Sequence, residues 1–166
     1  RAYQASQNRQ RTQVVVVVNA DVAADALCET LRLALQTDKV CVFESTTDIS
    51  DHPVVVTSYT QLSALQALVS NDDKAKRQLR VAVLYGQPGS TSEYDSVVNC
   101  IVTASNKVAK NATVSTVTKP KIYFFVNDGV DSAARQVIVS AYERYGATLP
   151  DIIQAQLDAT SQKTET

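Results

Sequence analysis

The sequence predicts an α/β fold in which a mostly parallel sheet of four or five strands lies between helices on both of its faces, giving three layers. Two observations carry this prediction. Short β-branched runs alternate with longer segments whose apolar residues recur every three or four positions. The run Val14–Val18 is apolar without alternation, as expected for a strand that is buried on both faces. Strands that alternate with helices are typical of parallel sheets joined by right-handed crossovers.

The first third of the chain predicts three strands and one helix. A β-branched run at 12–19 predicts the first strand. A helix is expected at 21–36, and its buried face is predicted to consist of Ala23, Ala26, Leu27, Leu31, Ala34 and Leu35. The second strand is expected at 39–45, where the sequence reads KVCVFES. A polar loop and a proline then lead into VVVTS at 54–58, the third strand.

The remainder predicts two further strands and three helices. The second helix begins at Tyr59 and carries an apolar stripe of Tyr59, Leu62, Leu65 and Val69. LRVAVLY at 79–85 and KIYFFVN at 121–127 predict the fourth and fifth strands. The helix between them is expected to end near residue 110 and to bury Tyr94, Val97, Val98, Ile101 and Val108. The last helix, defined by Ala134, Val137, Ile138, Ala141, Tyr142 and Tyr145, is ended by Gly146 and Pro150.

These elements indicate one domain. Residues 13–158 form the predicted α/β domain, between a polar lead-in at 1–12 and a polar tail at 159–166. A length of 166 residues and an apolar content of 45% suit a single domain with a real core. Because the chain begins with Arg1 and contains no methionine, we expect it to be part of a longer protein or a processed product.

Composition narrows the function classes. Sixteen basic residues against seventeen acidic ones disfavour a general nucleic-acid binder. No apolar segment approaches the roughly 20 residues of a membrane span. The three cysteines are widely spaced and accompany only one histidine, which disfavours disulfide frameworks and zinc sites. We therefore expect free buried thiols in a reducing, intracellular compartment.

The segment VAVLYGQPGSTSEYDS at 81–96 has the layout of a phosphate-binding loop, in which a strand, a glycine loop and a helix start succeed one another. A P-loop also requires a lysine, and Ser90 stands where that lysine would be needed. Ser90 and Glu93 instead match a capping box. Glu93 and Asp95 would repel a bound phosphate, so a capped turn is favoured over a weak anion site.

Cofactor and catalytic patterns are weak. The first predicted strand is followed by VNADVAAD, which lacks the glycines of a dinucleotide-binding turn. Asp21 and Asp128 follow strands and could bind magnesium, although helix capping is the favoured interpretation. His52 has no nucleophile-elbow motif beside it. No cofactor is therefore expected and a non-enzyme is favoured, while a smaller or atypical nucleotide stays open.

Over about residues 12–110 the predicted order is β-α-β-β-α-β-α. This order, with DHPVVVTS as the third strand and QLRVAVLY as the fourth, resembles a BRCT domain. The resemblance implies a non-catalytic protein-interaction module, often in nuclear, chromosome-associated proteins, some of which bind phosphorylated peptides. At the positions that match the family's phosphate ligands stand Asn19 and about Ser63, and neither is a cation.

The first hypothesis is thus a BRCT-like interaction module of a larger intracellular protein. Phosphate recognition would use hydroxyls and amides where the first strand ends and the second helix begins, with charge lent by a basic cluster. The candidate residues are Asn19, Thr57, Ser58, Thr60, Lys74 and Arg77. The hydroxyls of the VVVTSYT turn are expected to stand without nearby carboxylates.

Two alternatives remain. The first is a flavodoxin-like nucleotide-binding protein or enzyme with its site at the carboxyl ends of the strands. Its candidate residues, besides Asn19, are Asp21, Gly86, Ser90, Asn127 and Asp128. The second is a structural subunit of a large assembly.

Overall fold

The computed structural model describes residues 11–44, 48–71, 77–111, 120–125, 132–144 and 146. In chain order the elements are β1 (Arg11–Val18), α2 (Asp21–Leu35), β2 (Val40–Val42), β3 (Val54–Ser58), the short 3-10 helix η1 (Tyr59–Gln61), α3 (Leu62–Asn71), β4 (Arg77–Leu84), α4 (Thr91–Asn111), β5 (Lys121–Phe124) and α5 (Ser132–Arg144). The predicted lead-in up to residue 10, the tail, Tyr145 and Pro150 lie outside the described residues.

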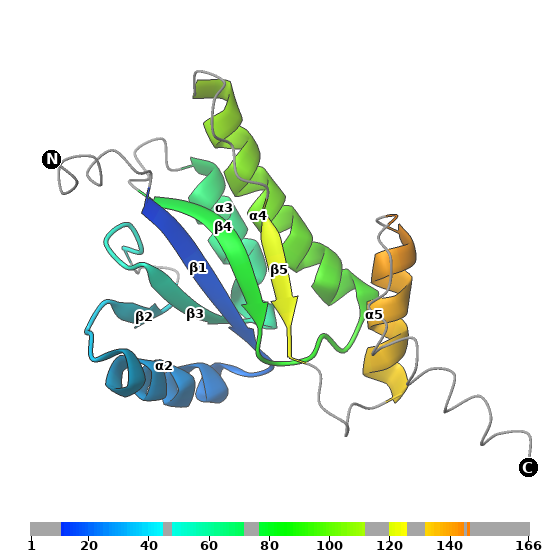
Figure 1. Cartoon of the computed structure of the whole chain (residues 1–166), viewed down its shortest axis with the longest axis horizontal. Coiled ribbons are helices and arrows are strands. Elements are labelled where there is room, and N and C mark those ends of the chain that lie inside the picture. Colours follow the sequence, from blue (N-terminus) through cyan, green and yellow to red (C-terminus); the bar gives the residue numbers. More distant parts are fainter. Residues whose placement is uncertain are drawn as a thin grey trace, which may run out of the picture.

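The five described strands form one parallel sheet in the order β2-β3-β1-β4-β5 (Figure 1). This confirms the predicted α/β class with its parallel sheet. The central strand β1 pairs on one side with β3, where Val14 faces Val54, and on the other with β4, where Val14 faces Val81. The first strand of the sequence therefore holds the middle of the sheet.

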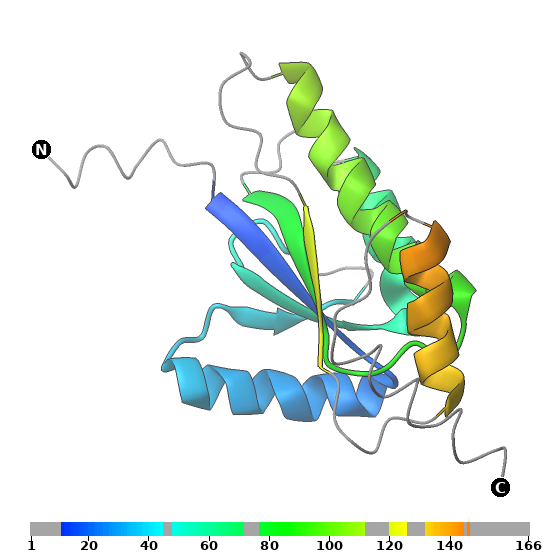
Figure 2. The ribbon, with the colours of Figure 1, turned by 45° about the vertical axis from the view of Figure 1, so that its right-hand side comes forward.

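Both faces of β1 are buried, as its unbroken apolar run predicts. Val15 and Val17 pack into a core shared with α3, α4 and α5, whereas Val16 and Val18 pack into a second core under α2. Figure 2 shows the resulting layers, with α3 and α4 on one side of the sheet and α2 on the other. Exposed fractions of 0 to 8% for these valines reflect that double covering.

The predicted buried face of α2 is partly wrong. Ala24 and Cys28 are the buried residues of this helix, with Leu27 and Leu31 partly buried beside them. Four residues predicted to be buried are instead exposed: Ala23, Ala26, Ala34 and Leu35. Alanine counts as apolar in a periodicity pattern but loses little when it faces water, so the predicted stripe lies about one residue away from the true contact face.

The other helices follow their predicted stripes where side chains are described. Leu62 and Leu65 of α3 and Val97 and Ile101 of α4 are at most 1% exposed. Among the described helices, none combines the length and apolar character needed to cross a membrane. Helix α5 packs beside α4, where Arg144 pairs with Asp95.

A cavity substitution on α3 should test the larger core. Leu65 is fully buried, so Leu65→Ala should lower the free energy of unfolding by about 2–5 kcal/mol because it leaves a void. Leu33 is 80% exposed, so Leu33→Ala is the matched control, with an expected change within about 0.5 kcal/mol. Urea titration followed by circular dichroism measures both, and equal losses would contradict the described packing.

Candidate functional site at the carboxyl edge of the sheet

The carboxyl ends of β3, β1 and β4 lie next to one another because these strands are parallel neighbours. The chain leaves β1 toward α2 on one face, whereas it leaves β3 and β4 toward α3 and α4 on the other face. The chain therefore leaves β1 on one face of the sheet, and it leaves both neighbours of β1 on the opposite face. In open α/β sheets, such divergence at the carboxyl edge marks the usual place for a ligand.

Polar side chains from two of these strand ends are joined at this edge. Ser58 Oγ, at the end of β3, donates a hydrogen bond to the carboxylate of Asp21, the first residue of α2. Thr60 Oγ1 lies 2.7 Å from Ser58 Oγ and 3.4 Å from Asp21 Oδ1. Ser58 is buried, while Asp21 and Thr60 are exposed. The carboxylate of Asp21 therefore lies at the surface, where the hydroxyls of Ser58 and Thr60 hold it by hydrogen bonds.

Gly86 completes this edge from the side of β4. The amides of Tyr85 and Gly86 both donate to Val17 O of β1, each at 2.9 Å. A Cβ atom on Gly86 would lie 1.8 Å from Asn19 Oδ1 and 2.6 Å from Asn19 N. The loop after β4 thus lies directly against the end of β1, and only glycine fits there. We call Asn19, Asp21, Ser58, Thr60 and Gly86 the strand-end cluster.

Tyr59, which follows β3 directly, forms a hydrogen bond to the loop after β4. Its hydroxyl donates to Gly86 O at 2.8 Å, and desolvation by burial, followed by the negative charge of Glu93, raises the pKa of the phenol. The hydroxyl therefore stays protonated and available as a donor. The sequence alone does not predict this role, because Tyr59 matches the apolar stripe of the following helix and nothing in the local pattern marks its hydroxyl.

The cluster merges residues from both predicted sets. Asn19, Ser58 and Thr60 belong to the predicted phosphate site, and Asp21 and Gly86 belong to the alternative site at the strand ends. The expectation that no carboxylate lies near the hydroxyls is wrong, because Asp21 accepts hydrogen bonds from both. The reason is the strand order, which places the end of β3 beside the start of α2.

Thr57 lies apart from the cluster. It is 1% exposed, and its Oγ1 donates to Ser58 O at 3.4 Å. Because successive side chains of a strand alternate, Thr57 points to the face that holds α3 and α4, opposite to Ser58. Lys74, Asn127 and Asp128 lie outside the described residues, as does the side chain of Arg77.

Ser90 caps α4, as its sequence context predicts. Ser90 Oγ accepts a hydrogen bond from the amide of Glu93 at 3.2 Å. Glu93 Oε2 in turn accepts from the amide of Gly89 at 2.6 Å, one residue before the amide of a standard capping box. The carboxylate of Glu93 thus binds an amide that a phosphate would need. This loop therefore serves as a capped turn between β4 and α4.

The histidine and the three cysteines of the chain lie away from the cluster. His52 precedes β3, at the opposite edge of the sheet, and Gln13 Nε2 donates to its carbonyl at 2.7 Å. Burial raises the pKa of the Cys41 thiol to about 11 and that of Cys100 to about 12, and it also raises the pKa of Cys28. Within the described ranges, no three His, Cys, Asp or Glu side chains form a group that could hold a metal ion.

A separate groove of about 350 Å³ lies between α2 and β2. Its lining includes the acidic residues Asp25, Glu29 and Glu44. Arg32 also lines it, but its guanidinium already bonds Glu29 at 2.6 Å and Val40 O at 2.9 Å. The guanidinium of Arg32 is therefore already engaged by groups of the protein itself.

No protein-family model matches the chain, and no curated protein matches it. The geometry of the strand-end cluster is therefore the basis on which a function can be inferred.

Replacement of Gly86 should test the close approach to β1. Gly86→Ala should destabilise the fold by about 1–3 kcal/mol, since the new methyl group would collide with the backbone of Asn19. Gly89→Ala is the matched control, because the nearest atom to its Cβ would lie 3.5 Å away, at ordinary contact distance. Chemical denaturation measures both changes, and a Gly86→Ala protein as stable as the Gly89→Ala protein would refute the contact.

The buried thiols predict an alkaline loss of stability. The pKa of Cys100 is raised from 9.0 to about 12, so the contribution of its neutral form is complete below pH 9 and falls as pH rises toward 12. The free energy of unfolding should therefore decrease between about pH 9 and pH 12, and it should decrease less in Cys100→Ala than in wild type. Identical pH dependence in the two proteins would show that this thiol is not the cause.

Proposed function

We propose that the chain is a non-catalytic protein-interaction module that binds its partner at the strand-end cluster, through a basic side chain of the partner. One observation carries this proposal: the charged group held at the junction of the strand ends is the carboxylate of Asp21. A carboxylate attracts lysine and arginine and repels phosphate.

The surroundings of Asp21 favour recognition of such a group. Both hydroxyls, those of Ser58 and Thr60, bond the same oxygen, Oδ1. Among the described residues, no donor is bonded to the second oxygen, Oδ2. The side chain is thus fixed in one orientation while one oxygen is left for an incoming donor. Such preorganisation lowers the entropic cost of binding a partner.

Binding is favoured over chemistry by the positions of the reactive groups. His52 lies at the amino edge of the sheet, and the thiols whose pKa is raised by burial are poor nucleophiles at neutral pH. The order of elements from β1 to α4 is β-α-β-β-α-β-α when the short helix η1 is left aside, and the resemblance to a BRCT domain stays a prediction from sequence. That resemblance implies the same class of function, although the proposal depends on the cluster alone.

A phosphorylated partner has weaker support at this edge. Ser58 and Thr60 would be natural donors to a phosphate, but both hydroxyls are committed to Asp21. A phosphate placed there would face a carboxylate within hydrogen-bond distance of its own donors. The repulsion between two anions at such a distance disfavours this version of the proposal.

A nucleoside-like ligand is the second candidate, and the divergence of connections around β1 favours it. Asp21 could accept hydrogen bonds from sugar hydroxyls, as acidic residues do at comparable edges. The same charge would oppose the phosphates of a nucleotide. The ligand of this alternative is therefore a compound rich in hydroxyl donors.

Titration with peptide probes tests the proposal. We expect arginine-rich and lysine-rich peptides to raise the melting temperature of the protein, and to shift the amide NMR signals of Asp21, Ser58 and Thr60. A ligand at 100 times its dissociation constant adds about 2.7 kcal/mol of stability. Asp21→Asn should weaken this binding roughly 10-fold or more, because one charge-assisted contact contributes about 1.5–3 kcal/mol.

Asp25→Asn provides the matched control, since Asp25 is an exposed acid of the same helix, one turn beyond the cluster. It should bind the basic peptides as wild type does. If phosphoserine peptides bind wild type more tightly than basic peptides do, the proposal is wrong about the charge of the partner, which would be negative. A response to nucleosides or sugars alone would favour the second candidate.

A further inference from the structure

One row of residues crosses the carboxyl edge of the sheet from β3 to β5. Ser58 of β3 pairs with Val18, the last residue of β1. Tyr85 and Phe125 each follow the last residue of a strand, β4 and β5, and the register of the paired strands brings both level with Val18. In order across the sheet, the row is therefore Ser58, Val18, Tyr85 and Phe125.

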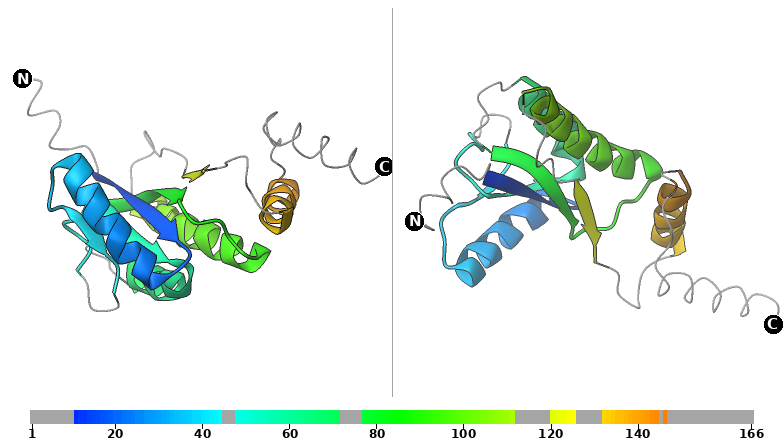
Figure 3. Two further views of the ribbon diagram at one scale, coloured as in Figure 1. Left: turned by 90° about the horizontal axis from the view of Figure 1, so that it is seen from below. Right: turned by 45° about the horizontal axis from the view of Figure 1, so that its top comes forward.

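This row faces the side of the sheet that α2 covers in part. Val18 packs into the core under α2, and side chains at the same level of neighbouring strands point to the same face. Helix α2 packs against β1, β2 and β3, and no described helix lies across β4 and β5 on that side (Figure 1; Figure 3, left). The part of the row on β4 and β5 is therefore open in the described part of the chain.

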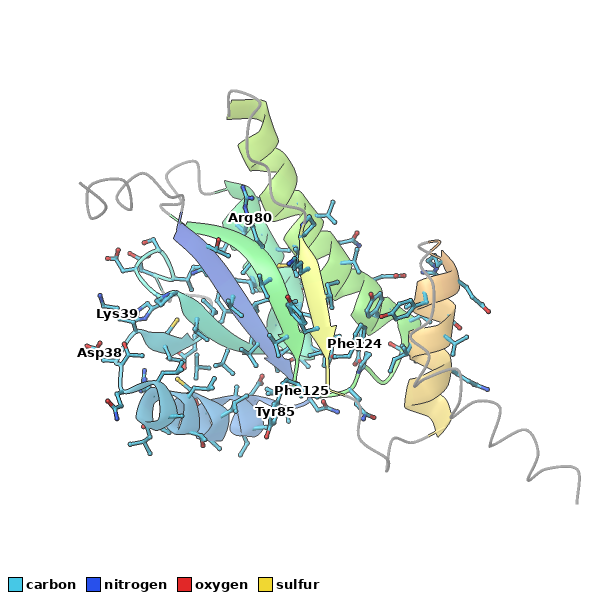
Figure 4. All side chains as sticks on the ribbon, in the orientation of Figure 1. Asp38, Lys39, Arg80, Tyr85, Phe124 and Phe125 are labelled. Carbon is cyan, nitrogen blue, oxygen red and sulfur yellow. The ribbon has the colours of Figure 1, made fainter. Side chains whose placement is uncertain are left out.

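Two exposed aromatic side chains form the open part of the row. Tyr85 and Phe125 are 58% and 62% exposed, and their rings meet edge to face at 6.0 Å. Figure 4 shows them together at the ends of their strands. We call Tyr85 and Phe125 the aromatic pair. Exposed aromatic side chains that gather in one place are typical of surfaces that bind other proteins.

The other end of the row carries the negative charge of the strand-end cluster. Ser58 donates to the carboxylate of Asp21, so this carboxylate lies at the end of β3. Asn19 is exposed and lies against Gly86, which follows Tyr85 directly. The carboxylate and the aromatic pair therefore belong to one continuous surface at the carboxyl edge of the sheet.

We propose that the partner binds through an extended segment with two anchors three or four residues apart: a lysine or arginine for Asp21, and a large apolar side chain for the aromatic pair. This inference rests on the proposed function and specifies its partner. Neighbouring strands lie about 4.8 Å apart, so the end of β3 lies about 10 Å from Tyr85 and about 14 Å from Phe125. An extended chain advances about 3.3 Å per residue and covers this span in three or four residues.

Charge favours this kind of segment over others. Among the described residues, no donor is bonded to Oδ2 of Asp21, so an apolar segment alone would cover the aromatic pair and leave that oxygen without a donor. An acidic or phosphorylated segment would be repelled by the carboxylate. A segment with one basic and one apolar anchor supplies a matching group for each end of the row.

A second copy of this chain is the other occupant to consider. Lys121 and Phe125 stand four residues apart, at the start of β5 and directly after it, and both are exposed. In a closed pair of copies, however, Phe125 would have to be both the bound side chain and part of the surface that binds it. A separate partner avoids this conflict.

Peptides of designed spacing test the proposal by NMR titration of the full chain. The reference peptide has one arginine in a glycine–serine background, and the test peptides add one leucine four residues before or after it. At least one test peptide should bind wild type about tenfold more tightly than the reference peptide, because the leucine is buried against the aromatic pair. The gain should vanish when the leucine is placed directly beside the arginine.

Substitutions in the aromatic pair provide the second measurement. Tyr85→Ala and Phe125→Ala should each reduce the gain from leucine to less than about twofold and leave the affinity for the reference peptide unchanged. Leu33→Ala is the matched control, because Leu33 is an exposed apolar residue near the far end of α2, and it should keep the full gain. Circular dichroism establishes that the variants keep the fold.

Three results would overturn the proposal. The first is equal affinity of wild type for the reference and test peptides, and the second is a gain that persists in both Tyr85→Ala and Phe125→Ala. The third is a wild-type dimer that dissociates in Phe125→Ala during sedimentation, which would make a second copy the occupant. In each case, weaker binding of the reference peptide by Asp21→Asn would still support the proposed function, whereas unchanged binding would overturn that function as well.

Discussion

The pairing of β1 with two parallel neighbours is the constraint on which the rest of the structure depends. The alternating side chains of this strand enter two separate cores, so neither helical layer forms without it. Its last carbonyls also organise the next loop, because Val17 O accepts the amides of Tyr85 and Gly86. The strand that builds the core thus also sets the position of the strand-end cluster.

The structure uses acidic residues at two helix starts in different ways. Glu93 acts locally, since its carboxylate bonds the amide of Gly89 beside the cap residue Ser90. Asp21 opens α2, whose N-cap residue Ala20 makes no side-chain capping bond. Its carboxylate reaches instead to Ser58, 37 positions along the chain. One acid stabilises its own helix, and the other joins a helix to a distant strand and stays exposed at the surface.

The sequence could predict what depends on neighbouring residues. The strand at 54–58 and the capping of α4 by Ser90 both follow from short patterns of residue types, and both agree with the structure. The bond between Asp21 and Ser58 could not be predicted, because it requires β3 to lie beside β1, and no local pattern fixes strand order. The contact between Gly86 and Asn19 could not be predicted either, because it requires β4 to lie beside β1.

The central position of β1 has a consequence for how the chain folds. Val14 pairs with Val54, 40 residues later, and with Val81, 67 residues later. During synthesis, β1 leaves the ribosome long before either neighbour exists. Its valine run must therefore wait as an unpaired apolar segment, and closing the two long loops makes the sheet a slow, late event. Until residue 84 has emerged, the valine run of β1 stays exposed, and exposed apolar strands are prone to aggregate.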